Sequence, residues 1–283
     1  MSVPDPEALE TALRRLHEKA SSSAAGYVDE ALDAVSAPTS PGLAGPEELP
    51  PLTPSAVAGA IDHTQLRPAA TDTQIDQLCE EARTHNFTSV CVHPTFVPRV
   101  VRRLEEVDVT ACTVVGFPHG ANRTSTKAQE ARRAVMDGAR ELDMVLALGA
   151  VTSGRYSDAE ADVRGVVTAA REQADAVGTP VPVKVILETA LLTPAQTAVA
   201  CVIARRAGAD FVKTSTGFAS TGARAEDVAL MRQVVGAELG VKASGGVGSV
   251  ADVERMMAHG ATRIGASGSV AIMEELQSSA ESS

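Results

Sequence analysis

The sequence predicts a (β/α)8 TIM barrel with an N-terminal helical extension, and three observations support this fold class. From residue 55 onward, apolar strand-like runs alternate with helical patterns roughly every 25–35 residues. Eight such strand–helix units in roughly 225 residues match a (β/α)8 barrel in number and length. Aromatic residues make up only 2% of the chain, so small aliphatic side chains must form a core of short, closely packed units. A doubly wound open sheet is the alternative, but its first strand usually ends in a glycine-rich turn, whereas DHTQL ends the first run here.

The expected elements follow in alternation along the chain. The strand-like runs are residues 57–62, 89–93, 109–117, 141–148, 181–188, 209–214, 239–243 and 263–266. The helical patterns are residues 73–83, 98–106, 125–137, 158–176, 194–207, 225–235 and 250–258, with a last helix after Ser269. Two helix starts carry capping signals, namely Ser157 with Glu160 three residues later, and Thr193 before Pro194.

Residues 1–54 form the predicted extension, and residues 55–283 form the predicted catalytic barrel domain. Within the extension, residues 7–20 place Leu9, Leu13 and Leu16 on one helical face, and residues 27–35 form a second short helical pattern. Residues 37–54 are rich in proline, glycine and serine and are typical of a linker. The apolar stripe of the first helix predicts that it docks onto the barrel or onto a second subunit.

Composition excludes some classes of partner. A net charge of −11 argues against a nucleic-acid partner, which requires clustered positive charge. No apolar run approaches the ~20 residues that span a bilayer, so we expect no membrane partner. The four cysteines contain no CxxC pair and no signal peptide precedes them, which predicts reduced core thiols in a cytoplasmic protein. We also expect a homo-oligomer, either a dimer or a tetramer.

Polar residues fall at the carboxyl ends of the expected strands, where barrel enzymes place their catalytic groups. A single buried aspartate or lysine is most often part of a structural ion pair. Several that converge on one face point to function instead, because a core gains nothing from bringing lysines together. Strand by strand, these residues are Asp62, His63 and Thr64, His93, His119, Asp143, Lys184 and Glu188, Lys213, Lys242, and Ser267.

Two lysines suggest amine chemistry. Only five of the 25 basic residues are lysines, and three of those five lie in apolar strand-like runs. Lys213 and Lys242 end neighbouring strands, so the repulsion between their ammonium groups, together with burial, would lower the pKa of one of them. A neutral amine can attack a carbonyl, and Asp143 on the inward side of its strand could carry protons. This combination is typical of a Schiff-base lyase, which requires neither a metal nor an organic cofactor.

Glycine-rich turns predict a phosphate site next to these lysines. Gly245 and Gly246 follow the seventh strand, and Gly268 with Ser267 follows the eighth. Loops at these two places in a barrel frequently bind phosphate through backbone N–H groups and a helix N-terminus.

Six motifs in order, nearly one per strand, resemble the class I deoxyribose-5-phosphate aldolase family. They are IDHT at 61–64, GFPHG at 116–120, ELDMV at 141–145, KVILET at 184–189, GADFVKTSTGF at 208–218 and VKASGG at 241–246, and the resemblance covers residues 57–273. It implies reversible cleavage of 2-deoxy-D-ribose 5-phosphate to D-glyceraldehyde 3-phosphate and acetaldehyde.

The resemblance also implies a role for each matching residue. Lys213 would form the Schiff base, Lys242 would favour its neutral amine, and Asp143 would donate and accept protons. The sugar site would be lined by Asp62, Thr64 and Lys184, and the phosphate would be held by Gly217, Gly245, Gly246, Ser267 and Gly268.

The chain departs from the family pattern at two places. Some relatives have a lysine directly after KTSTG, where this chain has Phe218, so a phosphate contact from that position is lost. Some relatives end in a tyrosine that reaches the site, but this chain ends in ELQSSAESS. The last proton transfer would therefore need water or Asp143.

Two other functions remain open from the sequence. His63, His93 and His119 end adjacent strands and could hold Zn²⁺ in a metal-dependent lyase. Because His63 directly follows Asp62, however, their side chains face opposite ways, which favours local hydrogen bonding for the histidine. A sugar-phosphate-binding barrel without catalysis is the other possibility, although a binding protein has no use for a neutral amine.

Overall fold

The computed structural model describes residues 5–37 and 52–281, and its centre is a closed barrel of eight parallel strands. Each strand pairs with the next along the chain, and β1 closes the barrel by pairing with β8. The strands are β1 (Ile61–Gln65), β2 (Ser89–Val92), β3 (Thr110–Val115), β4 (Glu141–Val145), β5 (Val183–Ile186), β6 (Phe211–Lys213), β7 (Gly240–Ser244) and β8 (Arg263–Ala266). The predicted (β/α)8 fold is therefore confirmed.

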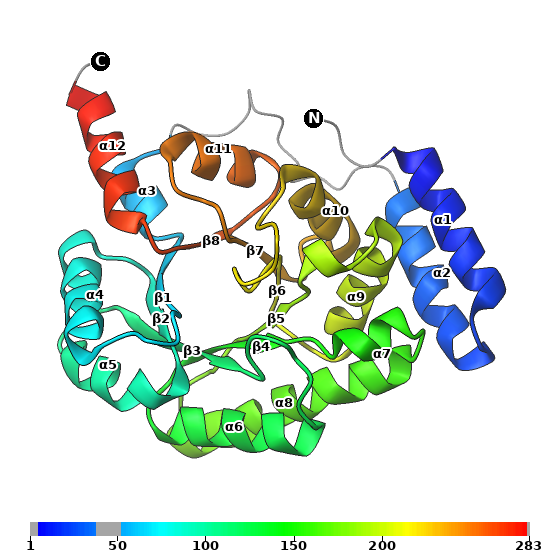
Figure 1. Cartoon of the computed structure of the whole chain (residues 1–283), viewed down its shortest axis with the longest axis horizontal. Coiled ribbons are helices and arrows are strands. Elements are labelled where there is room, and N and C mark those ends of the chain that lie inside the picture. Colours follow the sequence, from blue (N-terminus) through cyan, green and yellow to red (C-terminus); the bar gives the residue numbers. More distant parts are fainter. Residues whose placement is uncertain (1–4, 38–51, 282–283) are drawn as a thin grey trace.

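Helices surround this ring of strands (Figure 1). They are α3 (Pro54–Ala58), α4 (Asp72–His85), α5 (Val97–Arg103), α6 (Thr124–Met136), α7 (Leu148–Thr152), α8 (Tyr156–Val177), α9 (Pro194–Arg206), α10 (Ala225–Val235), α11 (Val250–Ala258) and α12 (Ser269–Glu281), with 3-10 turns η1 (Pro94–Phe96) and η2 (Thr189–Leu191). The core they enclose consists mainly of valine, alanine, leucine and isoleucine, as the scarcity of aromatic residues predicts. Short side chains let helices and strands pack closely.

The start of the barrel differs from the sequence prediction. Residues 57–62 were expected to form the first strand, but residues 54–58 form α3 and β1 begins at Ile61. The helix starts here because the Thr53 hydroxyl accepts a hydrogen bond from the Ala56 N–H at 3.2 Å and Pro54 occupies the first helical turn. The shift makes Asp62 the second residue of β1 instead of its last, which places this carboxylate deep inside the barrel.

The two predicted helix caps have different outcomes. At the start of α9, the Thr193 hydroxyl accepts from the Gln196 N–H, and the Gln196 side chain accepts from the Thr193 N–H, which forms a capping box. The Ser157 cap is wrong, because α8 begins one residue earlier at Tyr156 and Ser157 lies inside its first turn. Asp158 in the same turn complements the helix dipole.

The N-terminal helices α1 (Pro6–Lys19) and α2 (Ser22–Ser36) pack against each other and against α9 and α10 of the same chain (Figure 1). Leu9 and Leu13 are buried and belong to one hydrophobic cluster with the barrel helices. The Tyr27 hydroxyl donates to Glu160 at 2.7 Å, and the Arg206 guanidinium lies over the Tyr27 ring, 4.2 Å from its centroid. The extension thus docks onto its own barrel. Most of the predicted linker, residues 38–51, lies outside the described residues.

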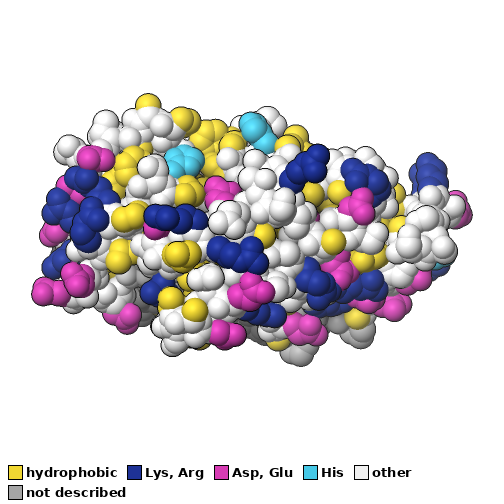
Figure 2. All heavy atoms as spheres, turned by 90° about the horizontal axis from the view of Figure 1, so that it is seen from below, with side chains coloured by type: hydrophobic (Ala, Val, Ile, Leu, Met, Phe, Trp, Pro, Cys, Tyr) yellow, Lys and Arg dark blue, Asp and Glu magenta, His cyan; other side chains and the backbone are white. Residues whose placement is uncertain are grey.

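Acidic and basic side chains are interspersed over the face shown in Figure 2. Such mixing produces no large field of one sign on this face. None of the described helices combines the length and the apolar character that crossing a bilayer requires.

Candidate active site

Three lysines converge on one carboxylate inside the barrel. The Nζ atoms of Lys213 and Lys242 both lie 2.7 Å from Oδ2 of Asp143, and Nζ of Lys184 lies 3.0 Å from its Oδ1. These side chains come from β6, β7, β5 and β4, which are consecutive around the barrel. All four are buried. The sequence predicted that these residues would meet, and the structure brings them together.

A second layer of charge lies beside this centre. Oδ2 of Asp62 lies 2.5 Å from Nζ of Lys242. Oδ1 of Asp62 accepts two hydrogen bonds of 2.7 Å, one from the Arg263 guanidinium and one from the Ser89 hydroxyl. Glu141 is 2.5 Å from Nζ of Lys184 and 3.2 Å from the Arg263 guanidinium. Sequence analysis missed Glu141, which begins β4 two residues before Asp143, and Arg263, which begins β8.

The charges in this cluster control the protonation of its carboxylates. Burial alone would raise the pKa of Asp143, but Lys184, Lys213 and Lys242 hold it well below its usual range. Burial would likewise raise the pKa of Asp62, and the neighbouring Lys242, Lys184 and Arg263 lower it instead. Both carboxylates are therefore ionised at neutral pH.

The pKa values of Lys242 and Lys184 shift in the opposite direction, above their usual values. Burial would lower the pKa of Lys242, but the contacts with Asp143 and Asp62 raise it above its usual value. The pKa of Lys184 is also raised, because Asp143 and further acidic groups outweigh burial. Sequence analysis expected a lowered pKa for one of Lys213 and Lys242, and Lys242 does not have it.

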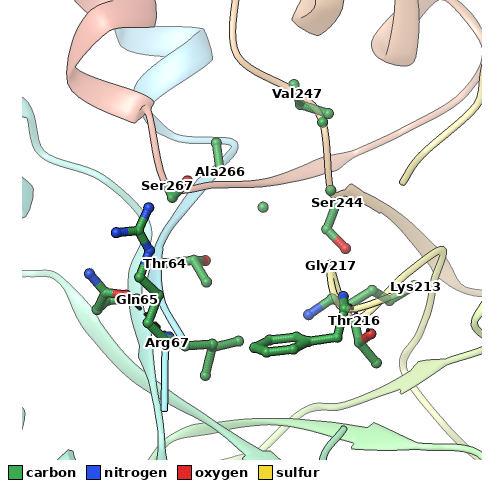
Figure 3. Close-up of a pocket in the computed structure, with 15 residues that line it drawn as sticks. Thr64, Gln65, Arg67, Lys213, Thr216, Gly217, Ser244, Val247, Ala266 and Ser267 are labelled. Carbon is green, nitrogen blue, oxygen red and sulfur yellow. Dashed lines mark hydrogen bonds between the residues drawn. The ribbon is translucent and has the colours of Figure 1, made fainter. Parts of the chain in front are cut away.

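A cavity of about 550 Å³ opens above the cluster at the carboxyl ends of the strands, and Lys213 is the cluster residue that reaches it. Figure 3 shows Thr64, Arg67 and Ser267 on one side of this cavity, with Lys213 and Ser244 on the opposite side. The lining residues are Thr64, Gln65, Leu66, Arg67, Lys213, Thr216, Gly217, Phe218, Ser244, Gly245, Gly246, Val247, Gly265, Ala266 and Ser267.

The predicted site residues divide into two layers. Five of the predicted substrate-binding residues line the cavity, namely Thr64, Gly217, Gly245, Gly246 and Ser267. The others lie outside its wall: Asp62 and Lys184 are fully buried in the charged cluster below, and Gly268 stands one residue beyond Ser267 at the start of α12. The deeper position of Asp62 follows from the shifted start of β1.

The loops after β6 and β7 shape the cavity wall. Gly245 and Gly246 both have positive φ, 85° and 76°, a conformation that favours glycine. Among the described residues, no protein acceptor meets the N–H groups of these two glycines, so they are available to an anion. The Glu188 carboxylate accepts from the Thr216 hydroxyl and N–H, which fixes the KTSTG loop.

Phe218 directly follows the KTSTG motif and lines the cavity. Its ring packs edge-on against Phe117 with centroids 5.5 Å apart, and Phe117 packs in the same way against His93. This aromatic row adds apolar surface beside the cavity and no positive charge. Sequence analysis did not predict the row, because the three residues come from separate loops.

The three histidines do not form a metal site. The His63 side chain contacts Glu81 at 2.7 Å, His93 contacts the Leu66 carbonyl at 2.9 Å, and His119 faces a different cavity. In residues 5–37 and 52–281, three potential ligands approach within 4.8 Å only at Cys91, Cys112 and Asp143. The lysines around Asp143 oppose a cation there, and burial raises the pKa of the Cys112 thiol well above its usual value.

The fold and this cluster define the chain as a (β/α)8-barrel enzyme whose lysine and carboxylate side chains meet a cavity at the carboxyl ends of the strands. The sequence pattern of the DeoC/LacD family of aldolases matches residues 56–278. The chain therefore belongs to the DeoC/LacD aldolase family, whose members are lyases.

Individual relatives agree with this assignment. Deoxyribose-phosphate aldolase 1 of Staphylococcus aureus strain Mu50 is 50% identical over 221 residues, which cover 78% of this chain and 97% of that protein. Deoxyribose-phosphate aldolase 2 of strain MRSA252 is 50% identical over 224 residues, covering 79% and 98%.

Solved structures share the architecture. A proposed deoxyribose-phosphate aldolase from Coccidioides immitis has a TM-score of 0.77 at 37% identity and covers 98% of this chain and 100% of that one. The tetrameric deoxyribose-phosphate aldolase of Aeropyrum pernix has a TM-score of 0.73 at 32% identity, covering 80% and 93%.

Proposed function

We propose that this chain reversibly cleaves 2-deoxy-D-ribose 5-phosphate to D-glyceraldehyde 3-phosphate and acetaldehyde through a Schiff base on Lys213. The observation that carries the proposal is the position of Lys213, whose Nζ contacts Asp143 while the side chain also lines the cavity. Lys184 and Lys242 contact the same carboxylate but are fully buried below. Lys213 is thus the lysine of the cluster that a substrate carbonyl can reach.

A count of charges supports Lys213 as the nucleophile. The cluster contains four cationic side chains, Lys184, Lys213, Lys242 and Arg263, against three carboxylates, Asp62, Glu141 and Asp143. Loss of one proton from a lysine balances the cluster. Lys213 contacts one carboxylate, that of Asp143, which it shares with two other lysines. Each of the other cations contacts at least two carboxylates. Its charge is therefore the least stabilised of the four.

The reaction then follows from this arrangement. The Lys213 amine adds to C1 of the open-chain sugar and expels water, which forms an imine that can accept an electron pair. Asp143, ionised in this environment, takes the C3 hydroxyl proton directly or through water as the C2–C3 bond breaks. The bonding electrons move into the enamine, and glyceraldehyde 3-phosphate leaves. Asp143 returns the proton to C2, and hydrolysis of the imine releases acetaldehyde and restores Lys213.

The wall of the cavity supports a phosphorylated substrate. The open N–H groups of Gly245 and Gly246 and the Ser267 hydroxyl lie on the rim that precedes α11 and α12. Gly217 lines the same cavity from the β6 loop. Phosphate binds readily to such backbone N–H groups near helix N-termini.

The tetrameric relative from Aeropyrum pernix supports our expectation that this chain forms a dimer or a tetramer. Its location in the cytoplasm stays a prediction.

Trapping with borohydride tests the proposal directly. The chain is incubated with acetaldehyde and sodium borohydride, digested, and analysed by peptide mass spectrometry. We expect an ethyl adduct on Lys213, because reduction fixes the imine as a secondary amine. Lys19, an exposed lysine on α1, is the internal control for non-specific alkylation. Labelling of Lys19 and Lys213 to the same extent, or no labelling of Lys213, would overturn the Schiff-base mechanism.

A further inference from the structure

We propose that Arg67 binds the phosphate group of the substrate and makes the enzyme prefer phosphorylated sugars. This inference rests on the proposed function and names a residue for it. Arg67 is not part of any motif discussed above, and sequence analysis did not single it out. It lies two residues beyond the end of β1, in the sequence IDHTQLR.

The barrel topology places Arg67 beside the predicted phosphate site. β1 pairs with β8 in parallel register, with His63 opposite Ala266, so the chain leaving β1 runs next to Ser267. Arg67 and Ser267 both line the cavity, and Figure 3 shows them on the same side of it. Lys213 lies across the cavity. This separation suits a substrate whose carbonyl and phosphate lie at opposite ends.

The guanidinium of Arg67 is free to bind a ligand. Among the described residues, no acceptor contacts it, whereas Arg263 and Arg99 are each held by two carboxylates. The backbone of Arg67 is fixed, because its N–H donates to the Gln65 side chain at 3.2 Å and its carbonyl accepts from Ala70 at 3.1 Å. A fixed backbone with an unpaired guanidinium matches what bidentate phosphate binding requires.

The charges of the cavity wall lead to the same assignment. Lys213 and Arg67 are the two cationic side chains among its lining residues, and none of the lining residues is acidic. Lys213 is occupied by imine chemistry and its neighbour Asp143. Phe218 cannot contribute positive charge from the β6 loop. A phosphate dianion at Gly245, Gly246 and Ser267 would therefore find its cationic partner in Arg67.

Arg67→Gln tests the assignment, with Arg102→Gln as the matched control. Arg102 is an exposed arginine in the last turn of α5 and lies outside the cavity. We expect Arg67→Gln to raise KM for 2-deoxyribose 5-phosphate about tenfold, since hydrogen bonds to charged groups contribute at this level. KM for unphosphorylated 2-deoxyribose should stay unchanged, and so should kcat for both sugars. Arg67→Lys should recover part of the loss, because it keeps the charge and loses the bidentate geometry.

Titration with inorganic phosphate gives a readout that does not depend on catalysis. Calorimetry should show phosphate binding about tenfold weaker in Arg67→Gln than in the wild type and in Arg102→Gln. Equal affinity in all three proteins would overturn the assignment. An equal change of KM for both sugars would also overturn it, because that pattern indicates a structural role.

Failure of this inference can be distinguished from failure of the proposed function. Suppose that acetaldehyde labels Lys213 in both the wild type and Arg67→Gln, and that the two proteins bind phosphate with equal affinity. The aldolase proposal is then supported, and the proposed role of Arg67 is wrong. If the wild type gives no adduct, the Schiff base falls, and the phosphate titration still decides whether Arg67 binds the anion.

Discussion

Lys127 and Lys213 are both buried lysines that contact an aspartate, yet their surroundings differ. Lys127 on α6 lies 2.6 Å from Oδ2 of Asp162 and donates to the Val145 carbonyl at 2.9 Å. One lysine meets one carboxylate there, and the charges balance. Lys213 shares its carboxylate with two other lysines and lines a cavity. Burial of a lysine therefore says little about function, whereas an excess of cations beside a cavity is informative.

The comparison also separates what each carboxylate does. Asp162 accepts from the Thr124 hydroxyl at 2.9 Å as well as from Lys127, so it joins two helices. Asp143 contacts lysines from three different strands and is ionised in a site that a substrate can approach. The first pair holds structure together, and we propose that the second carries chemistry. Three substitutions test this distinction.

The largest effect is expected for Lys213→Arg. Arginine keeps the positive charge but cannot provide a neutral amine, so we expect kcat/KM to fall by at least roughly 10⁴-fold. The protein should still fold, as circular dichroism would show. If the variant retained a tenth of the activity, Lys213 would not be the nucleophile, and its role would be structural like that of Lys127.

Lys127→Met should affect stability instead of chemistry. Removing the lysine leaves Asp162 buried without its partner, which we expect to cost roughly 3–5 kcal/mol in the free energy of unfolding. Urea unfolding measures this loss, and the kcat of the folded protein should stay close to that of the wild type.

The double variant Lys127→Met/Asp162→Leu is the control for this prediction. It removes both charges, so it should recover much of the stability that the single variant loses. A single variant as stable as the wild type would show that the pair contributes nothing, and a large fall in kcat would show that Lys127 acts on the site.

The smallest expected effect is a shift in pH dependence on Lys242→Leu. The contacts with Asp143 and Asp62 raise the pKa of Lys242, so it stays charged over the working range and opposes protonation of the Lys213 amine. Removing that charge should move the acidic limb of the pH–rate profile to higher pH by about one unit.

Arg263→Leu is the matched control for the pH shift. It removes a cation of the same cluster that contacts Asp62 and Glu141, and it should move the limb less. An unmoved limb in Lys242→Leu, or equal shifts in the two variants, would contradict a specific coupling between Lys242 and Lys213.

Much of this fold follows from local patterns in the sequence. The helices of residues 225–235 and 250–258 match the expectation at both ends, because apolar periodicity there coincides with the structural boundaries. The start of the barrel did not match the expectation, because the apolar stretch after Pro54 is compatible with a helix and with a strand. The cap at Thr53 decides in favour of the helix.

The site was predictable to a similar degree. Inward positions near strand ends identified Lys213, Lys242 and Asp143, because alternation along a strand fixes which side chains face the interior. Arg67 was not predicted as a site residue, because its position depends on the conformation of the loop after β1. Hydrophobic periodicity does not predict loop conformation. The position of Asp62 below the cavity depends on where β1 starts. The prediction for Asp62 was therefore wrong for the same reason as the prediction of the strand itself.

The docking of α1 and α2 onto the barrel has a consequence for how the chain folds during synthesis. Glu30 on α2 contacts Arg206 on α9, and these residues are 176 positions apart. At about 5–20 residues per second, the ribosome needs on the order of ten seconds or more to reach the docking partner after making α2. During that time the contacts of α1 and α2 with α9 and α10 cannot form. The first helices to be made are therefore among the last to reach their final contacts.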